Sequence, residues 1–175
     1  MDRTTRLLFL LVVSLLLVGC DQATKLYAIA NLEGQPQQTY LGDTVRIQYV
    51  ENKGAFLSLM ADWTRESRFL VLTLLNAGVL VGLAAYTLIR PQVDRWSITA
   101  FALILAGGLG NLIDRVRLDG IVVDFLNVGI GPLRTGIFNV ADVAIMAGFF
   151  VLVYVAFFGP SADDASDAPA AAAVA

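Results

Sequence analysis

Histidine is absent from this sequence, and cysteine occurs only once. Zinc sites built from paired histidines and cysteines are therefore excluded, and so are catalytic triads that need a histidine base. The Gly-x-Ser-x-Gly turn of serine hydrolases is also missing, and a single cysteine permits no internal disulfide. We expect a protein that uses neither a metal nor another cofactor.

Charge is scarce as well. Only 15% of the 175 residues are charged, whereas 57% are hydrophobic and the mean hydropathy is +0.71. A soluble domain normally has about 25% charged residues, so this composition indicates a membrane protein. Three of the acids that produce the net charge of −3 are in the tail, at Asp163, Asp164 and Asp167. No basic stripe is present, so we expect no nucleic-acid partner.

Four apolar segments stand out, and crossing a bilayer needs about 20 such residues in a helix. The first segment runs from Leu7 to Cys20 and is too short, unless the helix continues through the following DQATKLYA. The sequence thus predicts an all-α membrane protein. Its four transmembrane helices are expected at about residues 6–27, 69–89, 96–113 and 138–158.

The four spans are expected to form one domain, residues 1–158, followed by a disordered acidic tail at 159–175. Small residues four apart predict close packing between helices in lipid. Two such pairs are present, Gly78 with Gly82 and Ala106 with Gly110.

Two polar links join the spans on the side away from the termini, at residues 28–67 and 114–137. Within the first link, residues 44–50 (TVRIQYV) alternate between polar and apolar side chains, which predicts a strand. We therefore expect a small extracytoplasmic β region between the first two helices. The other link, residues 90–95, is a tight turn.

Four spans place both termini on one side of the membrane. Arg3, Arg6, Arg90 and Arg95 flank the spans on that side, as the positive-inside rule expects of the cytoplasm. The remaining eight of the 12 basic residues lie on the other side. The charge count alone therefore leaves the orientation open.

Ionisable and amide side chains gather near the ends of the spans on the side away from the termini. They are Asp21, Lys25, Asn111, Asp114, Arg115, Asp124, Asn139 and Asp142. Ionisable groups at membrane depth are costly, so they indicate a functional site. Asp21–Lys25 and Asp114–Arg115 also fit ion pairs that only anchor helix ends. Asp124 and Asp142 have no base beside them that would explain them in this way.

Two carboxyl groups held close together share a proton, because both cannot ionise at once. The ionised group can activate water while the protonated one donates to a peptide carbonyl, which is the chemistry of an aspartic peptidase. One alternative is a dyad of Lys53 and Ser58. Another is a proton-coupled transporter, although its relay would need polar groups throughout the bilayer. A lipoprotein that matures at Cys20 is disfavoured because three spans follow it.

Five motifs accompany the spans. They are DQATK (21–25), NKGAF (52–56), GGLGNLIDR (107–115), VVDF (122–125) and FNVAD (138–142). In this order they resemble the lipoprotein signal peptidases, also called signal peptidase II, over about residues 5–158. The resemblance implies an aspartic endopeptidase of the bacterial inner membrane that cuts prolipoproteins just before a diacylated cysteine. It also implies cytoplasmic termini, an active site near the periplasmic face, contact with membrane lipid and inhibition by globomycin, and we expect a monomer.

The resemblance implies that Asp124 and Asp142 are the catalytic pair. The residues that it implies for substrate binding are Asn52, Gly54, Asn111, Arg115 and Asn139. The residues that it implies for support of the site are Asp21, Lys25, Asp114 and Ala141. Among these, Asp114 is expected to steady Arg115, and Asn139 and Ala141 to orient Asp142.

Two features do not follow the family pattern. Gly120 comes one residue later than the pattern places it, so Asp119 looks like an inserted residue. We expect the turn before Asp124 to absorb this insertion. Cys20 ends a lipobox-like LVGC, which we expect to be a coincidence of composition in the first helix and not a processing site.

Overall fold

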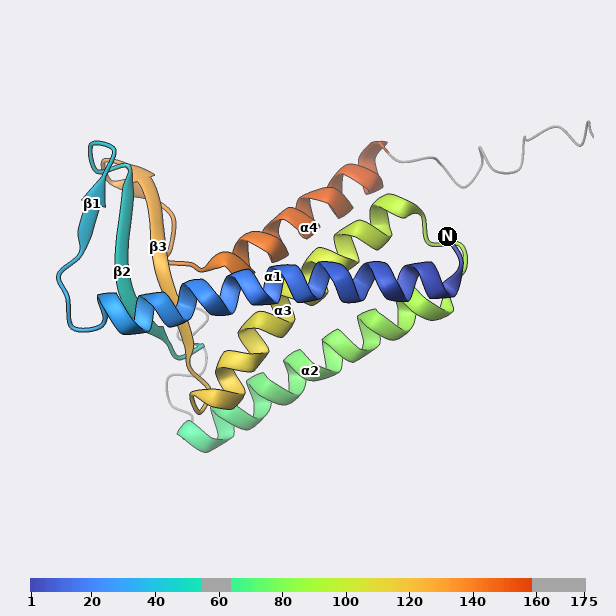
Figure 1. The fold of residues 1–175 in the computed structure, drawn as a ribbon, viewed down its shortest axis with the longest axis horizontal. Coiled ribbons are helices and arrows are strands. Elements are labelled where there is room, and N and C mark those ends of the chain that lie inside the picture. Colours follow the sequence, from blue (N-terminus) through green and yellow to red (C-terminus); the bar gives the residue numbers. More distant parts are fainter. Residues whose placement is uncertain (55–63, 159–175) are drawn as a thin grey trace, which may run out of the picture.

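The computed structural model describes residues 1–54 and 64–158. In chain order, the elements in these ranges are α1 (Arg3–Leu32), β1 (Gln38–Tyr40), β2 (Val45–Asn52), α2 (Arg65–Ile89), α3 (Arg95–Arg117), β3 (Val122–Ile130), β4 (Leu133–Arg134) and α4 (Val140–Phe158). Each helix is long and apolar enough to cross a membrane, and the strands gather at one end of the helices (Figure 1). The predicted fold class is confirmed. The tail and Ser58 lie outside the described residues.

Helix α1 is longer than a bilayer requires. It continues without a break past Cys20 and Lys25, as predicted, and has 30 residues. At 1.5 Å per residue it is about 45 Å long, against roughly 30 Å for the hydrocarbon core. Its last turns therefore extend beyond that thickness, where Ala28 and Leu32 pack against Val123 and Phe125 of β3.

Helix α3 is the centre of the bundle and contacts each of the other helices. It can do so because small residues face its neighbours. A Cβ atom added at Gly107 would meet Ala141 and Ile145 of α4, and one added at Gly108 would meet Leu80 of α2. The predicted close packing at Ala106 and Gly110 is confirmed, since Ala106 is buried and Gly110 lies against Asp21 and Ala141.

The predicted packing at Gly78 and Gly82 is wrong. A Cβ atom added at either glycine would meet no described atom within 4 Å. Helix α2 instead turns Leu80, which is buried, toward Gly108 of α3. The spacing of small residues shows where a backbone can be approached, but the packing of Leu80 decides which face is used.

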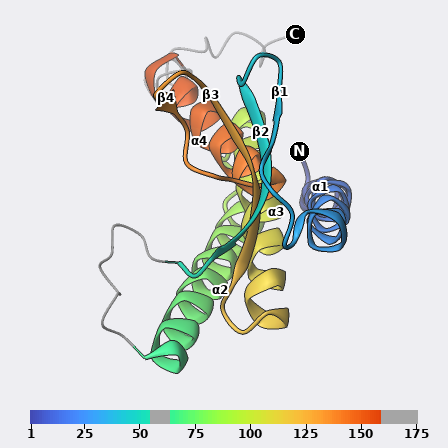
Figure 2. The ribbon, with the colours of Figure 1, turned by 90° about the vertical axis from the view of Figure 1, so that its left-hand side faces the viewer.

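The sheet is antiparallel, with the strand order β1-β2-β3-β4. The predicted strand at residues 44–50 is found as β2, but its main partner β3 comes from the link between α3 and α4. In the register of this pair, Val50 lies opposite Asp124 and Asn52 lies opposite Val122. The sheet lies across the end of the bundle away from the N-terminus (Figures 1 and 2), and so brings the two polar links together.

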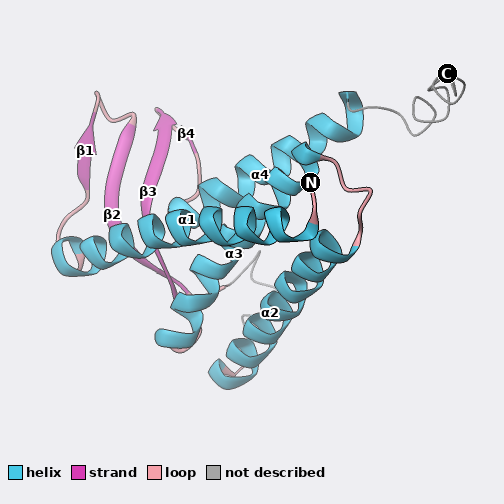
Figure 3. Cartoon of the chain, turned by 45° about the vertical axis from the view of Figure 1, so that its right-hand side comes forward, coloured by secondary structure: helices cyan, strands magenta, loops and turns pink. Residues whose placement is uncertain are grey.

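At the opposite end, the N-terminus lies beside the loop between α2 and α3 (Figure 3). Arg6 is buried there, with 4% of its surface exposed. Its guanidinium donates to the carbonyl oxygens of Thr87 at 3.2 Å, Arg90 at 2.5 Å and Pro91 at 2.7 Å. Arg6 therefore satisfies free carbonyl groups at the C-terminus of α2. The sequence itself had placed it only among the arginines that flank the spans.

Candidate active site

The polar residues predicted for the site converge where the sheet meets α1, α3 and α4. Asp124 lies on β3, and Asp142 lies in the first turn of α4. Asn111 and Arg115 come from the last turns of α3, Lys25 from α1 and Asn52 from the end of β2. Residues that are far apart in the sequence thus form one hydrogen-bonded cluster.

Asp124 is almost fully buried, with 2% of its surface exposed. Its Oδ2 accepts a hydrogen bond from Asn52 Nδ2 at 2.9 Å, and its Oδ1 accepts one from Asn139 Nδ2 at 2.7 Å. Burial raises the pKa of Asp124 to about 6, and the nearby carboxyl group of Asp142 also acts to raise it. The amides of Asn52 and Asn139 and the charge of Lys25 oppose this rise. Asp124 can therefore hold or release a proton near neutral pH.

Asp142 is fixed by a reciprocal cap at the start of α4. The backbone N–H of Asp142 donates to Asn139 Oδ1 at 3.0 Å, and the backbone N–H of Asn139 donates to Asp142 Oδ2 at 3.1 Å. This is the geometry of a capping box, with an acid in the third helical position. The other carboxylate oxygen, Oδ1, accepts a hydrogen bond from Asn111 Nδ2 at 2.9 Å.

Two buried asparagines join the aspartates. Asn139 is fully buried, and its Nδ2 donates to Asp124 Oδ1 and also lies 3.2 Å from Asn111 Oδ1. Asn111 in turn donates to Asp142. Each aspartate is therefore connected to the other through amide side chains, and Asn139 contacts both.

Asn52 and Gly54 lie on the rim of the site, at the end of β2. Asn52 Oδ1 accepts a hydrogen bond from the backbone N–H of Gly54 at 2.9 Å while its Nδ2 bonds to Asp124. Gly54 has a φ of 73°, a left-handed conformation that favours glycine. The tight turn at Gly54 thus keeps the Asn52 amide pointed at Asp124.

Behind the aspartates is a buried ion cluster. Lys25 Nζ lies 2.9 Å from Asp21 Oδ2 and 3.0 Å from Asp114 Oδ2. We expected Asp114 to steady Arg115. Asp114 pairs with Lys25, and its negative charge also acts on Arg115. Helix α1 approaches α3 closely at Gly110, where Asp21 takes the space that a larger side chain would fill. That approach brings Lys25 within reach of Asp114.

Arg115 is half-buried near the exposed side of the cluster. Its Nη1 donates to the carbonyl oxygen of Asn111 at 3.3 Å. Its Nε atom is buried and has no hydrogen-bond partner among the described residues. The guanidinium therefore retains unused donor capacity beside the residue that bonds to Asp142.

Gln22 is a part of the cluster that the sequence analysis missed. Its Nε2 donates to Asp114 Oδ1 at 2.9 Å and lies 3.2 Å from both Asp21 Oδ2 and the carbonyl oxygen of Gly110. In the sequence, only its place inside the DQATK motif pointed to Gln22. Asp21 and Lys25 share a helix face, and Gln22 does not lie on that face, so the spacing gave no reason to include it.

The turn before Asp124 accommodates the residue that looked inserted. Asp119 and Gly120 both have positive φ, at 51° and 92°. The N–H of Gly120 donates to the carbonyl oxygen of Arg115 at 2.7 Å, which closes the end of α3. Beyond this turn, β3 begins at Val122 and Asp124 still meets Asn139.

An apolar groove of about 540 Å³ opens beside Asp142. Its lining includes Phe138, which precedes α4, and Val143, Met146 and Phe150 along one face of that helix. A hydrophobic molecule could thus reach the carboxylate from the surface of a transmembrane helix. Within the described ranges, no group of three or more metal-binding side chains is present.

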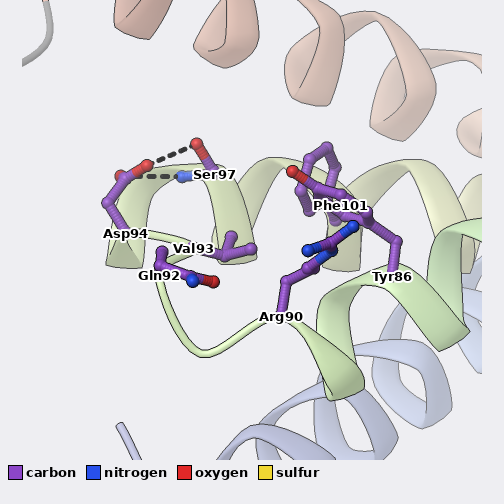
Figure 4. A pocket seen from close by; sticks show the side chains of 7 residues that line it. All are labelled: Tyr86, Arg90, Gln92, Val93, Asp94, Ser97 and Phe101. Atoms are coloured by element: carbon purple, nitrogen blue, oxygen red, sulfur yellow. Dashed lines mark hydrogen bonds between the residues drawn. The ribbon is translucent and has the colours of Figure 1, made fainter. Parts of the chain in front are cut away.

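A second cavity, of about 400 Å³, lies at the other end of the bundle (Figure 4). Its acid, Asp94, accepts hydrogen bonds from the backbone N–H of Ser97 at 3.1 Å and of Trp96 at 2.8 Å. Asp94 thus caps the N-terminus of α3. Tyr86 and Phe101 pack edge to face at 5.8 Å. These residues stabilise the turn between α2 and α3, and Asp94 is the one acid among the described residues that line this cavity.

The chain is similar to known proteins over most of its length. A sequence model of the family described as signal peptidase (SPase) II matches residues 13–158. The lipoprotein signal peptidase of Mycobacterium tuberculosis is 39% identical over 160 residues, which are 88% of this chain and 73% of the relative. That of Rhodococcus jostii is 35% identical over 163 residues, or 90% and 77% of the two chains.

Solved structures share the fold. A bacterial membrane enzyme determined at 1.9 Å by the in meso method has a TM-score of 0.72 and 25% identity, and the match covers 87% of this chain and 94% of the other. A second such enzyme, at 2.3 Å, has a TM-score of 0.67 and 26% identity, with 95% and 94% covered.

Proposed function

The chain belongs to the signal peptidase II family, and we propose that it removes the signal peptides of prolipoproteins by cutting just before the diacylated cysteine. The observation that carries this proposal is the pair of aspartates from separate elements, Asp124 on β3 and Asp142 on α4, joined by the amides of Asn111 and Asn139. Such a pair can hydrolyse a peptide without a metal or a covalent intermediate.

We assign the proton to Asp124 and the negative charge to Asp142. The pKa of Asp124 is raised to about 6, mainly by burial, so its protonated form is within reach near neutral pH. Asp142 accepts hydrogen bonds from Asn111 Nδ2 and from the Asn139 backbone, which stabilise a carboxylate. Asp142 then takes a proton from water as the water oxygen attacks the scissile carbonyl carbon, and Asp124 donates its proton to the carbonyl oxygen. As the C–N bond of the tetrahedral intermediate breaks, the leaving nitrogen takes the proton from Asp142 and one hydroxyl group of the intermediate returns a proton to Asp124.

The substrate backbone is held by groups around the pair. The half-buried guanidinium of Arg115 lies beside Asn111, and its terminal N–H groups are suited to bind peptide carbonyl oxygens. Asn52 and Gly54 lie on the rim next to Asp124 and would close over a bound peptide. Asn139 would keep both carboxyl groups in place while the peptide bond is hydrolysed.

The substrate reaches the site from the membrane. The apolar groove along α4 ends at Asp142, so a signal peptide and a lipidated cysteine can approach without leaving the apolar phase. We assign the protein to the bacterial inner membrane as a monomer, with both termini in the cytoplasm and the sheet on the periplasmic side. The buried charges around Asp124 are thereby placed near the outer surface.

Cleavage of a defined substrate tests this function. The full-length protein in detergent should cut a prolipoprotein peptide whose cysteine carries diacylglycerol, and mass spectrometry should find a product that begins at that cysteine. The same peptide without the lipid should be cut far more slowly. Absence of the lipidated product, or a cut at another bond, would overturn the proposal.

A proton-coupled transporter is the other function considered for intramembrane aspartates. Among the described residues, the buried acids Asp21, Asp114 and Asp124 all lie at the sheet end, and the buried charge at the other end is Arg6. A relay would need polar groups along the bilayer between them. The geometry therefore favours a single reaction site.

A further inference from the structure

Lys25 makes an unusually complete set of contacts for a lysine in a membrane helix. Only 2% of its surface is exposed. Its Nζ atom lies 2.9 Å from Asp21 Oδ2, 3.0 Å from Asp114 Oδ2 and 2.9 Å from Asn111 Oδ1. An ammonium group has three N–H donors, so each of them has an acceptor.

The contact with Asn111 decides which way its amide points. Lysine has no acceptor, so only the oxygen of the Asn111 amide can face it. The Nδ2 group must then point the other way, toward Asp142 Oδ1, which it meets at 2.9 Å. If the amide turned over, its oxygen would face the carboxylate of Asp142 and repel it.

The two carboxylates beside Lys25 hold the backbone next to each catalytic aspartate. Asp114 Oδ2 accepts a hydrogen bond from the N–H of Val123 at 3.1 Å, and Val123 precedes Asp124. Asp21 Oδ1 accepts one from the N–H of Ala141 at 2.9 Å. Ala141 in turn precedes Asp142. Lys25 lies between the two carboxylates and offsets their mutual repulsion, so it holds the two backbone segments at a fixed separation.

We propose that Lys25 is a positioning residue for peptide cleavage, which fixes the amide of Asn111 and the spacing between Asp124 and Asp142. This inference rests on the proposed function. Asn139 Nδ2 also lies near Asn111 Oδ1, at 3.2 Å, but Lys25 makes the shorter and charged contact, at 2.9 Å. A cation that only balanced charge would not need this contact, and apolar residues could replace such an ion cluster without loss of stability. The positioning role instead requires the N–H group of Lys25 itself.

The first test is Lys25→Met, which keeps an unbranched side chain as far as Cε but removes the Nζ atom and its donors. Binding-competent sites are counted by titration with globomycin, so that loss of folded protein does not lower kcat. Per competent site, we expect kcat for the diacylated peptide to fall about 100-fold, as for a misplaced catalytic group, while KM changes less than threefold. Arg46→Met removes a cation from a partly exposed ion pair with Asp43, away from the proposed catalytic pair, and should leave both constants unchanged. A kcat within threefold of the wild type overturns the proposal.

A second comparison covers the case in which Lys25→Met does not fold. The double variant Lys25→Met/Asp114→Asn keeps the summed charge of Asp21, Lys25 and Asp114 at −1, and its amide oxygen can still accept from Val123. It should have a kcat at least about tenfold lower than Asp114→Asn alone, because only the single variant keeps the contact of Lys25 with Asn111. Equal kcat values overturn the positioning role. A wild-type protein that cuts no lipopeptide would instead refute the proposed function.

Discussion

In the proposed mechanism, the amides that bond to Asp124 affect whether it carries the proton. Asn52 and Asn139 each donate to Asp124 and so favour its ionised form, against the effect of burial and of Asp142. The balance leaves the pKa of Asp124 at about 6. In the proposed mechanism Asp124 must be protonated, so activity should decline as the pH rises through this pKa.

Asn52→Ala tests this balance. Removal of a donor to the carboxylate raises the pKa of Asp124, so the protonated form persists to higher pH. The alkaline limb of the kcat/KM profile should therefore move to higher pH, even if the maximal rate falls. Asn127→Ala, which removes an amide of β3 that bonds to Thr135 and Arg134 instead, should not move it. A shift to lower pH in Asn52→Ala would contradict the assignment of the proton.

Arg115 and Arg117 provide a second comparison at this scale. Arg115 is half-buried and contacts Asn111, whereas Arg117 is exposed and contacts Gln22. Loss of a charged hydrogen-bond donor to the substrate corresponds to about 1.5–3 kcal/mol, so Arg115→Ala should lower kcat/KM by roughly 10- to 100-fold. Arg117→Ala should leave kcat/KM within about twofold of the wild type, as expected for an exposed charge. Equal losses in a lipopeptide cleavage assay would show that both arginines only anchor the helix end.

At the scale of elements, the helices follow from the sequence because length and polarity define a span. The sheet is harder to predict. In β3, residues Val122 to Phe125 are buried on both faces, so the strand lacks the alternation that revealed β2. Strands β1 and β4 have three and two residues, too few for a period.

The same limit applies to the choice of partners within the site. Asp124 and Asp142 could be proposed from the sequence because no base lies beside them. The pairing of Asp114 with Lys25 could not be predicted, since it depends on how closely α1 approaches α3 at Gly110. Spacing along one helix shows which residues share a face, but tertiary packing decides which helix that face meets.

Glycines of α2 and α3 test this account of helix packing. Gly107→Ala would place a methyl group against the backbone of Ala141 and should destabilise the bundle by about 1–3 kcal/mol. It should also slow cleavage, because Ala141 precedes Asp142. Gly78→Ala meets open space and should be neutral or stabilising by up to about 1 kcal/mol. Thermal unfolding in detergent measures both changes, and equal effects would contradict the packing of α3.

The whole molecule has an outer surface of apolar side chains and a polar interior at one end. Leu15 and Leu16 of α1 are 75% and 70% exposed, whereas Asp21 and Lys25 on the same helix are 1% and 2% exposed. This distribution suits a lipid environment around the bundle and a reaction centre under the sheet. Cys20 lies between the two regions, within an unbroken helix, and is exposed.

We predict that Cys20 is not a processing site. A cut before it would remove most of the first span and separate Asp21 and Lys25 from the rest of α1. Cys20→Ala should therefore keep full activity and thermal stability. Intact-mass measurement of the purified wild type should show the complete N-terminus without lipid. A mature chain that began at a diacylated Cys20 would refute the four-span architecture.

The most direct test of the aspartic mechanism is the cleavage rate of Asp124→Asn and of Asp142→Asn. Each amide has the shape of the carboxyl group but cannot exchange its proton, so kcat should fall by about 100- to 10,000-fold in both variants. Thermal unfolding should confirm that each variant is folded, and EDTA should leave the wild-type rate unchanged. Substantial cleavage by either folded variant would contradict the proposal that Asp124 and Asp142 together carry out the reaction.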